Sequence, residues 1–230
     1  MERILIVAAH PDDEVLGCGG FIAKYAQTGT PIRVRFLGEG ITARYLPEDF
    51  NKDSVKFEID QRNKNAIKAL NILGVSEENI FFSHRYCCRF DQIPLIDLVK
   101  EIEIAIHDFK PTLLLSHAAH DANIDHCITH KALLSAIRPI NLNFLKKIMT
   151  FEVLSSTEWN PTHPFQPNCF YDITDFIDSK INALAAYDDE MRSPPHSRSE
   201  QVLKSLASYR GAQCGVMYAE AFQLIRSLSR

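Results

Sequence analysis

Short runs of hydrophobic residues alternate with longer amphipathic stretches along most of this chain. The first run, residues 4–8, is continuously apolar and rich in β-branched side chains, which is typical of a strand buried on both faces. Runs of this kind predict six strands. They lie at residues 3–8, 31–37, 79–82, 112–116, 147–153 and 169–172.

The amphipathic stretches between these runs predict helices. In residues 94–109, hydrophobic side chains recur at steps of three or four, which places them on one helical face. Helices are expected at residues 15–28, 54–73, 94–109 and 126–137, and the remaining segments also favour helices, at 173–187 and from 199 or 200 to 211. Because strands and helices alternate, we predict an α/β fold with a doubly wound, mostly parallel sheet and helices on both faces. No linker or repeat interrupts the pattern, so a single domain is expected over residues 1–230.

The composition excludes several classes of protein. The 230 residues are 46% hydrophobic and 23% charged, which is ordinary for a soluble globular chain. The net charge of −4 and the scattered basic residues argue against nucleic acid or an anionic membrane as a partner. No apolar run approaches the roughly 18–20 residues that span a bilayer, and the first strand begins too early to leave room for a signal peptide. Six irregularly spaced cysteines argue against a disulfide framework and a thiolate zinc site. We therefore expect a cytoplasmic protein with reduced thiols.

The turn after the first strand carries the most chemistry. His10, Asp12 and Asp13 follow this strand directly, and residues 117–125, which lead to His126, follow the fourth. The first and fourth strands of a doubly wound sheet are commonly neighbours, so both loops are expected at one edge. Two imidazoles and one carboxylate are a common zinc set that leaves a position for water. We predict a metal site from His10, Asp13 and a histidine of the second loop, with Asp12 as general base.

These motifs have other interpretations as well. Asp12 or Asp13 could simply cap the following helix. The glycines of residues 17–20 suggest a nucleotide-binding loop, but Ile22 stands where G-x-G-x-x-G requires its third glycine, and three acidic residues would face the phosphates. The dinucleotide interpretation is therefore disfavoured.

Two further side chains have competing interpretations. His130 follows His126 by four residues, a spacing that can chelate zinc, but the glutamate of His-Glu-x-x-His is missing. We therefore favour His126 alone as the ligand. For Trp159, in the loop at residues 157–168, a packing role is favoured over a role as a platform for a sugar ring.

Several motifs together resemble one enzyme family. Residues 9–14 (AHPDDE) and 16–20 (LGCGG) resemble the signature of the PIG-L/LmbE-like family of zinc-dependent N-deacetylases. Residues 123–126 (NIDH) resemble its second motif, which ends in Asp-His. Further similarity lies at residues 38–40, 61–62, 90–91, 195–198 and 209–211. The resemblance therefore covers nearly the whole chain.

This resemblance implies a Rossmann-like single domain that removes the N-acetyl group from an amino sugar of the N-acetylglucosamine type, free or linked to a nucleotide or lipid. By motif position, His10, Asp13 and His126 would hold Zn²⁺, and Asp12 would activate the water that attacks the acetyl carbonyl. The same donor set can take Fe²⁺ or another divalent ion. The expected partner is a small N-acetylated sugar, and assembly into homo-oligomers is also expected.

The sequence departs from the family pattern at Asn123, where many members have a histidine with the acid or oxyanion role. An amide can donate a hydrogen bond to an oxyanion but cannot deliver a proton. Either Asp12 acts twice, or another residue supplies the proton; our hypothesis is that His196 does so, and Asp125 could orient such a group. Candidate contacts for sugar hydroxyls or a phosphate are Arg44, Arg62, Asp91, Arg192 and Arg198.

Other functions remain open. The same machinery would serve an amidase that acts on another N-acyl group or on a thiol-glycoside conjugate. A protein that keeps the metal but is inactive, and that binds a sugar or a protein partner, draws some support from Asn123 and from the untypical residues 86–88. Asp12 argues against this alternative, because binding alone does not need a second carboxylate beside the metal ligands.

Overall fold

A seven-stranded sheet lies at the centre of the computed structural model, which describes residues 2–140, 142–188 and 190–229. Its strands are β1 (Ile4–Ala8), β2 (Ile32–Phe36), β3 (Ile80–Phe81), β4 (Leu113–His117), β5 (Lys147–Phe151), β6 (Cys169–Asp172) and β7 (Ala219–Ser227). Their order across the sheet is β3-β2-β1-β4-β5-β7-β6. The strands from β3 to β5 are parallel, whereas β7 is antiparallel to both β5 and β6. The predicted α/β fold with a mostly parallel sheet is confirmed.

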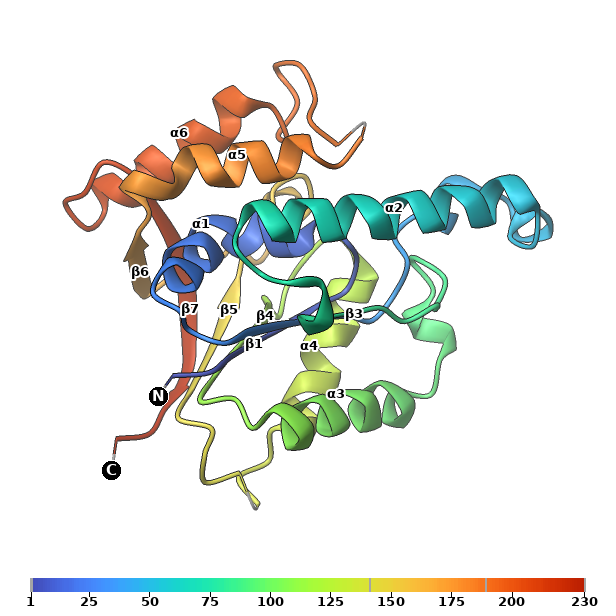
Figure 1. Ribbon diagram of the computed structural model, residues 1–230, viewed down its shortest axis with the longest axis horizontal. Helices are drawn as coiled ribbons and strands as arrows, with labels where there is room; N and C mark the ends of the chain where they lie inside the picture. Colours follow the sequence, from blue (N-terminus) through green and yellow to red (C-terminus); the bar gives the residue numbers. More distant parts are fainter. Residues whose placement is uncertain (1, 141, 189, 230) are drawn as a thin grey trace.

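Helices cover both faces of this sheet (Figure 1). They are α1 (Asp13–Gln27), α2 (Asp53–Ile72), α3 (Leu95–Phe109), α4 (Ile124–Ala136), α5 (Ile177–Ala185) and α6 (Glu200–Ala212). Helices α1, α2, α5 and α6 lie on one face, and α3 and α4 lie on the other. Neighbouring residues of β1 point to opposite faces, so Ile4 and Ile6 join the first core and Leu5 and Val7 the second. All six predicted helices are present, with small shifts at their ends.

Strand β7 lies in a segment that the hydrophobic pattern does not mark as a strand, so the expectation that only helices remain is wrong there. Its first four residues, including Glu220, are all buried, and they show no alternation of polar and apolar side chains. Glu220 is buried because it bonds to helix α1, a contact 200 residues distant in sequence. Local periodicity cannot reveal such a strand.

Helix α1, which carries the first motif, is broken at Cys18, where φ is −149°. The N–H groups of residues 20–21 donate to the buried Glu220 carboxylate at 2.9 and 2.7 Å. Lys180 donates to the carbonyl of Leu16 at 2.8 Å and pairs with Glu220 at 2.6 Å. A buried ion pair from α5 and β7 therefore satisfies backbone groups on both sides of the break.

The glycines of the first motif serve packing. A Cβ atom at Gly17 would lie 2.3 Å from the Phe151 ring of β5, and one at Gly20 would lie 2.8 Å from Ile173. Only glycine lets α1 approach the sheet this closely. The glycines are thus explained without a nucleotide.

The topology brings four loops to one edge of the sheet. Strand β1 pairs with β2 on one side and with β4 on the other, and β4 pairs with β5. All four strands are parallel, so the loops that follow them lie at the same carboxyl edge. Open α/β sheets bind their ligands at this edge. The predicted neighbourhood of β1 and β4 is confirmed.

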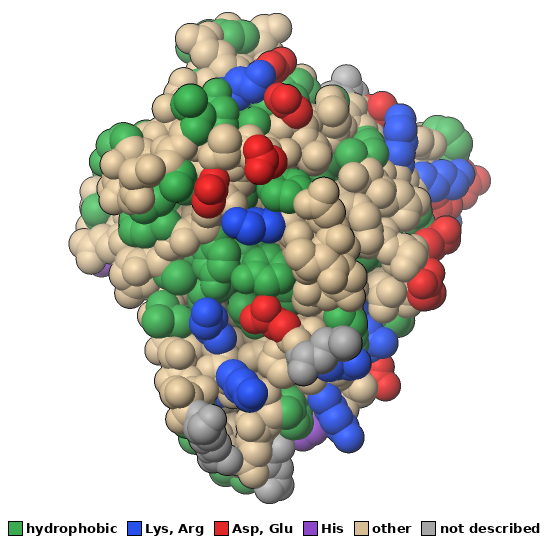
Figure 2. Space-filling model, turned by 60° about the vertical axis from the view of Figure 1, so that its left-hand side comes forward, with side chains coloured by type: hydrophobic (Ala, Val, Ile, Leu, Met, Phe, Trp, Pro, Cys, Tyr) green, Lys and Arg blue, Asp and Glu red, His purple; other side chains and the backbone are tan. Residues whose placement is uncertain are grey.

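The surface on the side that carries β6 and β7 is mixed in charge. Figure 2 shows lysine and arginine side chains interspersed with acidic ones around an area of hydrophobic side chains. On this face the basic residues form no continuous patch. Within the described residues, no helix combines the length and the apolar character needed to cross a membrane.

Candidate active site

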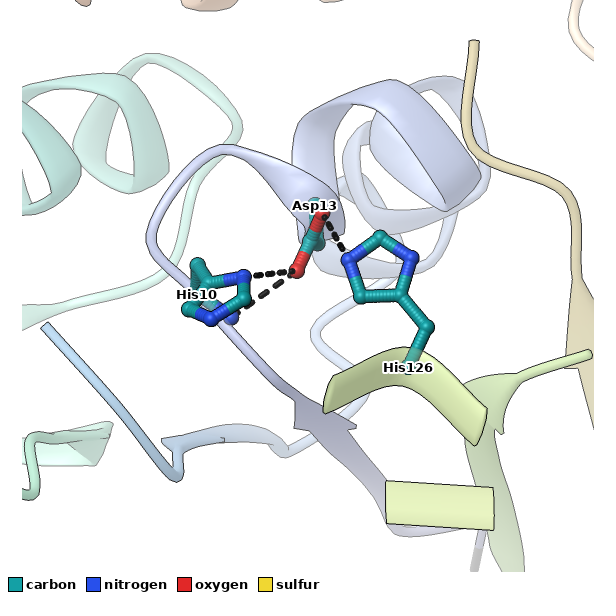
Figure 3. Close-up of side chains that lie close together, drawn as sticks. All are labelled: His10, Asp13 and His126. Atoms are coloured by element: carbon teal, nitrogen blue, oxygen red, sulfur yellow. Dashed lines mark hydrogen bonds and ion pairs between the residues drawn. The ribbon is translucent and has the colours of Figure 1, made fainter. Parts of the chain in front are cut away.

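Three buried side chains from two motifs meet at the carboxyl edge (Figure 3). His10 follows β1, Asp13 begins α1 and His126 lies in the first turn of α4. Asp13 stands between the two imidazoles: its Oδ2 lies 3.6 Å from His10 Nδ1 and its Oδ1 lies 3.3 Å from His126 Nε2. One donor atom from each residue lies within 4.8 Å of the others. The structure therefore brings together all three predicted ligands.

Each histidine of the cluster is held by a second carboxylate. Asp125 Oδ2 lies 2.9 Å from His10 Nε2, and Asp121 Oδ2 lies 3.2 Å from His126 Nδ1. A carboxylate on one ring nitrogen favours the proton there and leaves the other nitrogen with its lone pair. His10 Nδ1 and His126 Nε2 are thus the two nitrogens free to act as ligands, and both face Asp13.

The donor set fits a divalent metal ion. His126 Nε2 is buried and makes no hydrogen bond within the described part of the chain. Burial lowers the pKa of His126, but the carboxylates of Asp13 and Asp121 outweigh burial and raise it to about 10. The cluster therefore favours positive charge at this point, and two nitrogens with one carboxylate are a common zinc-binding set. The identity of the metal stays a prediction.

Asp12 has an unusual backbone and a paired carboxylate. Its φ is 118°, a conformation that costs energy in a non-glycine residue. It precedes α1, but its side chain makes no capping hydrogen bond. Instead its Oδ2 accepts from Arg62 at 2.7 Å and from Arg198 at 2.6 Å. Asp13 Oδ2 likewise accepts from the N–H of His10 rather than from the helix. The alternative that these aspartates merely cap the helix is wrong.

Glu14 supports the strained backbone of Asp12. Its Oε2 accepts from the Asp12 N–H at 2.9 Å, and its Oε1 accepts from the Tyr187 hydroxyl at 2.5 Å. Burial raises the pKa of Glu14 to about 8. Tyr187 also lies under the Arg62 guanidinium, 4.9 Å from ring centroid to cation. Glu14 and Tyr187 therefore position both Asp12 and one of its arginines.

Glu190, which the sequence did not single out, links three of the predicted arginines. Arg44 and Arg62 each lie 2.6 Å from its Oε1, and Arg198 pairs with its Oε2. Arg62 is buried, and its guanidinium bridges Glu190 and Asp12. Arg62 and Arg198 thus hold the Asp12 carboxylate, whereas Arg44 remains half exposed at the cavity wall.

A cavity of about 430 Å³ opens over this cluster. Its floor is formed by His10, Asp12, Asp13 and His126, all of which are buried. Its walls come from the loops after β2 and β5, from residues 87–88, from the start of α4 and from the Glu190 and Arg198 segment. Asn123 lines it as well, and its Oδ1 accepts the N–H of Asp125 at 2.9 Å as the N-cap of α4.

Three predicted residues lie outside the cavity lining and away from the buried cluster. His196, Asp91 and Arg192 are exposed at the surface. The His196 Nδ1 atom accepts the N–H of Arg198 at 3.0 Å, so this imidazole shapes the loop that presents Arg198. The structure does not bring these three to the metal ligands, and their roles in catalysis or binding stay predictions.

Several residues of the site were not identified from the sequence patterns. His117 stacks on His126 with 4.0 Å between ring centroids, and burial lowers its pKa to about 3. Its Nε2 accepts the Ala9 N–H at 2.8 Å, while His130 Nδ1 bonds to the His117 carbonyl. Cys87 Sγ lies 3.3 Å from His10 Nε2. Histidine-rich residues 117–126 were the available signal for His117, whereas nothing local marks Cys87.

Comparison with known proteins identifies the family. The chain matches the PIG-L family, described as GlcNAc-PI de-N-acetylase, over residues 5–137, which is more than half of its length. The protein therefore belongs to the PIG-L family. A relative from Bacillus subtilis (strain 168), the probable N-acetyl-alpha-D-glucosaminyl L-malate deacetylase 2, is 26% identical over 201 residues, covering 81% of this chain and 82% of the relative.

Two solved structures show the same fold. One is N,N'-diacetylchitobiose deacetylase from Pyrococcus horikoshii with its inhibitor MPG, at TM-score 0.76 and 19% identity over 98% of this chain and 84% of the other. The second is GalB, the 4-carboxy-2-hydroxymuconate hydratase from Pseudomonas putida KT2440, at TM-score 0.74 and 22% identity over 100% and 98%. Since one is a deacetylase and the other a hydratase, the fold alone does not define the reaction.

Proposed function

We propose that this protein is a metal-dependent hydrolase that removes the N-acetyl group from an amino sugar. The observation that carries the proposal is the buried cluster of His10, Asp13 and His126, in which Asp125 and Asp121 hold the two imidazoles. The family description and the names of two of the similar proteins support the same reaction class.

The metal would be held by His10 Nδ1, His126 Nε2 and the Asp13 carboxylate. When bound, zinc would polarise the acetyl carbonyl and lower the pKa of a water molecule towards about 7. The same donors would accept iron(II) or another divalent ion. The protein's part is to direct one ring nitrogen of each imidazole towards Asp13, because Asp121 and Asp125 hold the ring proton on the opposite nitrogen.

Asp12 would take the proton from the attacking water. Its carboxylate lines the cavity beside the ligands, and both arginines donate to Oδ2. Among the described residues none donates to Oδ1, which is therefore the atom left to face water or substrate. Arg62 and Arg198 fix the orientation of this carboxylate, and a general base in such a position contributes about 10²–10⁴-fold.

Asn123 would stabilise the developing oxyanion. Its Oδ1 is engaged by the N–H of Asp125, so its amide N–H₂ is the group left to donate. A donor aimed at charge that forms in the transition state favours the reaction. Since the amide cannot deliver a proton, Asp12 is the candidate that returns the proton to the departing amine.

The test is acetate release from N-acetylglucosamine and its glycosides by the metal-loaded protein. Asp12→Asn is expected to lower kcat by about 100-fold or more while the metal content stays that of the wild type. His196→Ala separates the two candidates for returning the proton. A wild-type kcat in His196→Ala would leave Asp12 as the residue that returns the proton, whereas a large loss of kcat at unchanged metal content would assign that step to His196.

Other reactions give different products in the same assay. An amidase for another N-acyl group or a thiol-glycoside conjugate would release the corresponding acid and leave N-acetyl sugars intact. A hydratase would add water to an unsaturated acid and release no acetate. If the protein is an inactive sugar-binding protein, the wild type and Asp12→Asn would bind the sugar with equal affinity, and neither would release acetate.

A further inference from the structure

Trp159 is an exposed aromatic side chain on the wall of the cavity. It ends the 3₁₀ turn η5 (Thr157–Trp159) in the loop after β5, and 57% of its surface is exposed. It also lines the cavity that holds the metal cluster. The favoured packing role is therefore wrong for most of this side chain. A large apolar ring left in solvent beside a catalytic floor needs another explanation.

The turn that carries Trp159 is fixed to the metal cluster. Thr157 Oγ1 donates to Asp121 Oδ2 at 2.7 Å, and Ser156 Oγ also donates to Asp121. The Glu158 carboxylate accepts the N–H groups of the two serines that precede Thr157. Asp121 is the carboxylate that orients His126. The turn that carries the indole is thus held at a set place relative to the cluster, so a ligand need not order this part of the backbone.

The strand order places Trp159 across the cavity from a cation. The cluster lies over β1 and β4, with β2 beside β1 and β5 beside β4. Arg44 belongs to the loop after β2, and Trp159 belongs to the loop after β5. Both line the cavity and both are exposed, whereas the floor residues are buried. The mouth therefore offers an exposed aromatic ring on one wall and, on the other, the guanidinium of Arg44, which is paired with Glu190.

We propose that Trp159 is the platform for a second sugar ring, so that the substrate is a disaccharide or larger glycoside of an N-acetyl amino sugar. This inference rests on the proposed function. If the acetamide of the substrate lies at the floor of the cavity, the amino-sugar ring that carries it lies just above His10, Asp13 and His126. The group attached to this sugar ring then reaches the mouth of the cavity. One face of a pyranose presents C–H groups, which complement the negative face of an indole. The hydroxyls at its edge remain free to bond with Arg44.

The chain has one tryptophan, so its fluorescence reports this position alone. The probes are N,N'-diacetylchitobiose and N-acetylglucosamine, titrated into the metal-loaded Asp12→Asn protein, in which turnover is expected to be about 100-fold slower or more. The disaccharide is expected to change the emission saturably, at about tenfold lower concentration than the monosaccharide. No saturable change with the disaccharide, or equal affinity for the two sugars, would overturn the proposal.

Kinetics gives an independent readout. In Trp159→Ala, the ratio of kcat/KM for the disaccharide to that for the monosaccharide is expected to fall about tenfold, and Trp159→Phe should restore most of it. Phe57→Ala is the matched control, since Phe57 is 66% exposed on α2 and outside the cavity lining. An unchanged ratio in Trp159→Ala would overturn the platform.

The two proposals fail in different ways. Acetate release with an unchanged ratio would leave the deacetylase intact and remove the platform. Without acetate from either sugar, the proposed function fails, and the fluorescence titration alone then decides on the platform. If Trp159→Ala shifts the oligomeric state in size-exclusion chromatography and leaves the ratio unchanged, the indole belongs to an interface and the platform is overturned.

Discussion

Asp125 holds the predicted metal ligand His10 through the ring nitrogen Nε2, which faces away from Asp13. Its Oδ2 contacts His10 Nε2 and accepts the N–H of Cys88, and its Oδ1 accepts the N–H of Phe90. Asp125→Asn keeps an oxygen for one of these two N–H groups and removes the charge that holds the proton on His10 Nε2. We predict that metal affinity falls by about 10–100-fold, measured by competition with a chelator of known affinity.

Asp97→Asn is the matched control for this variant, because Asp97 is exposed in the first turn of α3. It should bind metal like the wild type. Wild-type affinity in Asp125→Asn would contradict the role assigned to this carboxylate.

Residues of the site differ in how far the sequence could reveal them. His10, Asp13 and His126 follow directly from two motifs placed after neighbouring strands. Glu190 could not be predicted, because it acquires its role only when α2 and the segment before α6 bring their arginines to it. His196 differs in another way: its motif is recognisable, but the side chain is exposed at the surface, and its catalytic role stays a prediction.

At the scale of elements, the break in α1 depends on a buried ion pair. Glu220→Gln would leave Lys180 buried without its countercharge and weaken the acceptor for the N–H groups of residues 20–21. We predict a loss of about 3–5 kcal/mol in the free energy of unfolding, measured by urea denaturation. The surface pair of Glu200 and Lys204 provides the control.

Glu200→Gln is expected to cost less than about 1 kcal/mol, since exposed ion pairs contribute little. Equal losses in the free energy of unfolding for Glu220→Gln and Glu200→Gln would show that the ion pair of Glu220 and Lys180 does not stabilise the break in α1.

At the scale of the whole molecule, Glu190 ties together the loop after β2, helix α2 and the segment before α6 through Arg44, Arg62 and Arg198. Burial acts to raise the pKa of Glu190, but the three guanidinium groups outweigh burial and lower it to about 2. A carboxylate with a lowered pKa stabilises the fold above its ordinary pKa, and this stabilisation is lost as the pH falls towards the lowered value.

We therefore predict that Glu190→Gln is less stable than the wild type at neutral pH, and that the difference shrinks as the pH falls through the ordinary glutamate range towards about 2. Urea unfolding of both proteins across the acidic range measures this difference. A difference that stays constant down to the acid transition would contradict the charge-based account.

The sequence predicts most of the architecture because periodicity is local. The parallel strands and all six helices follow from hydrophobic patterns, and the neighbourhood of β1 and β4 follows from the general order of such sheets. Strand β7 does not follow, because its polar residue Glu220 is buried by α1 and α5 rather than by its own strand neighbours. The antiparallel edge of the sheet therefore depends on contacts between distant segments, which local sequence patterns do not reveal.

The proposed function requires a divalent metal held by His10, Asp13 and His126, so the most direct test is elemental analysis of the anaerobically purified protein. We predict about one divalent ion per chain in the wild type and none retained in His126→Ala. Circular dichroism of the variant confirms that it is folded. A folded wild-type protein that carries no metal and takes up no added zinc or iron(II) would contradict the account.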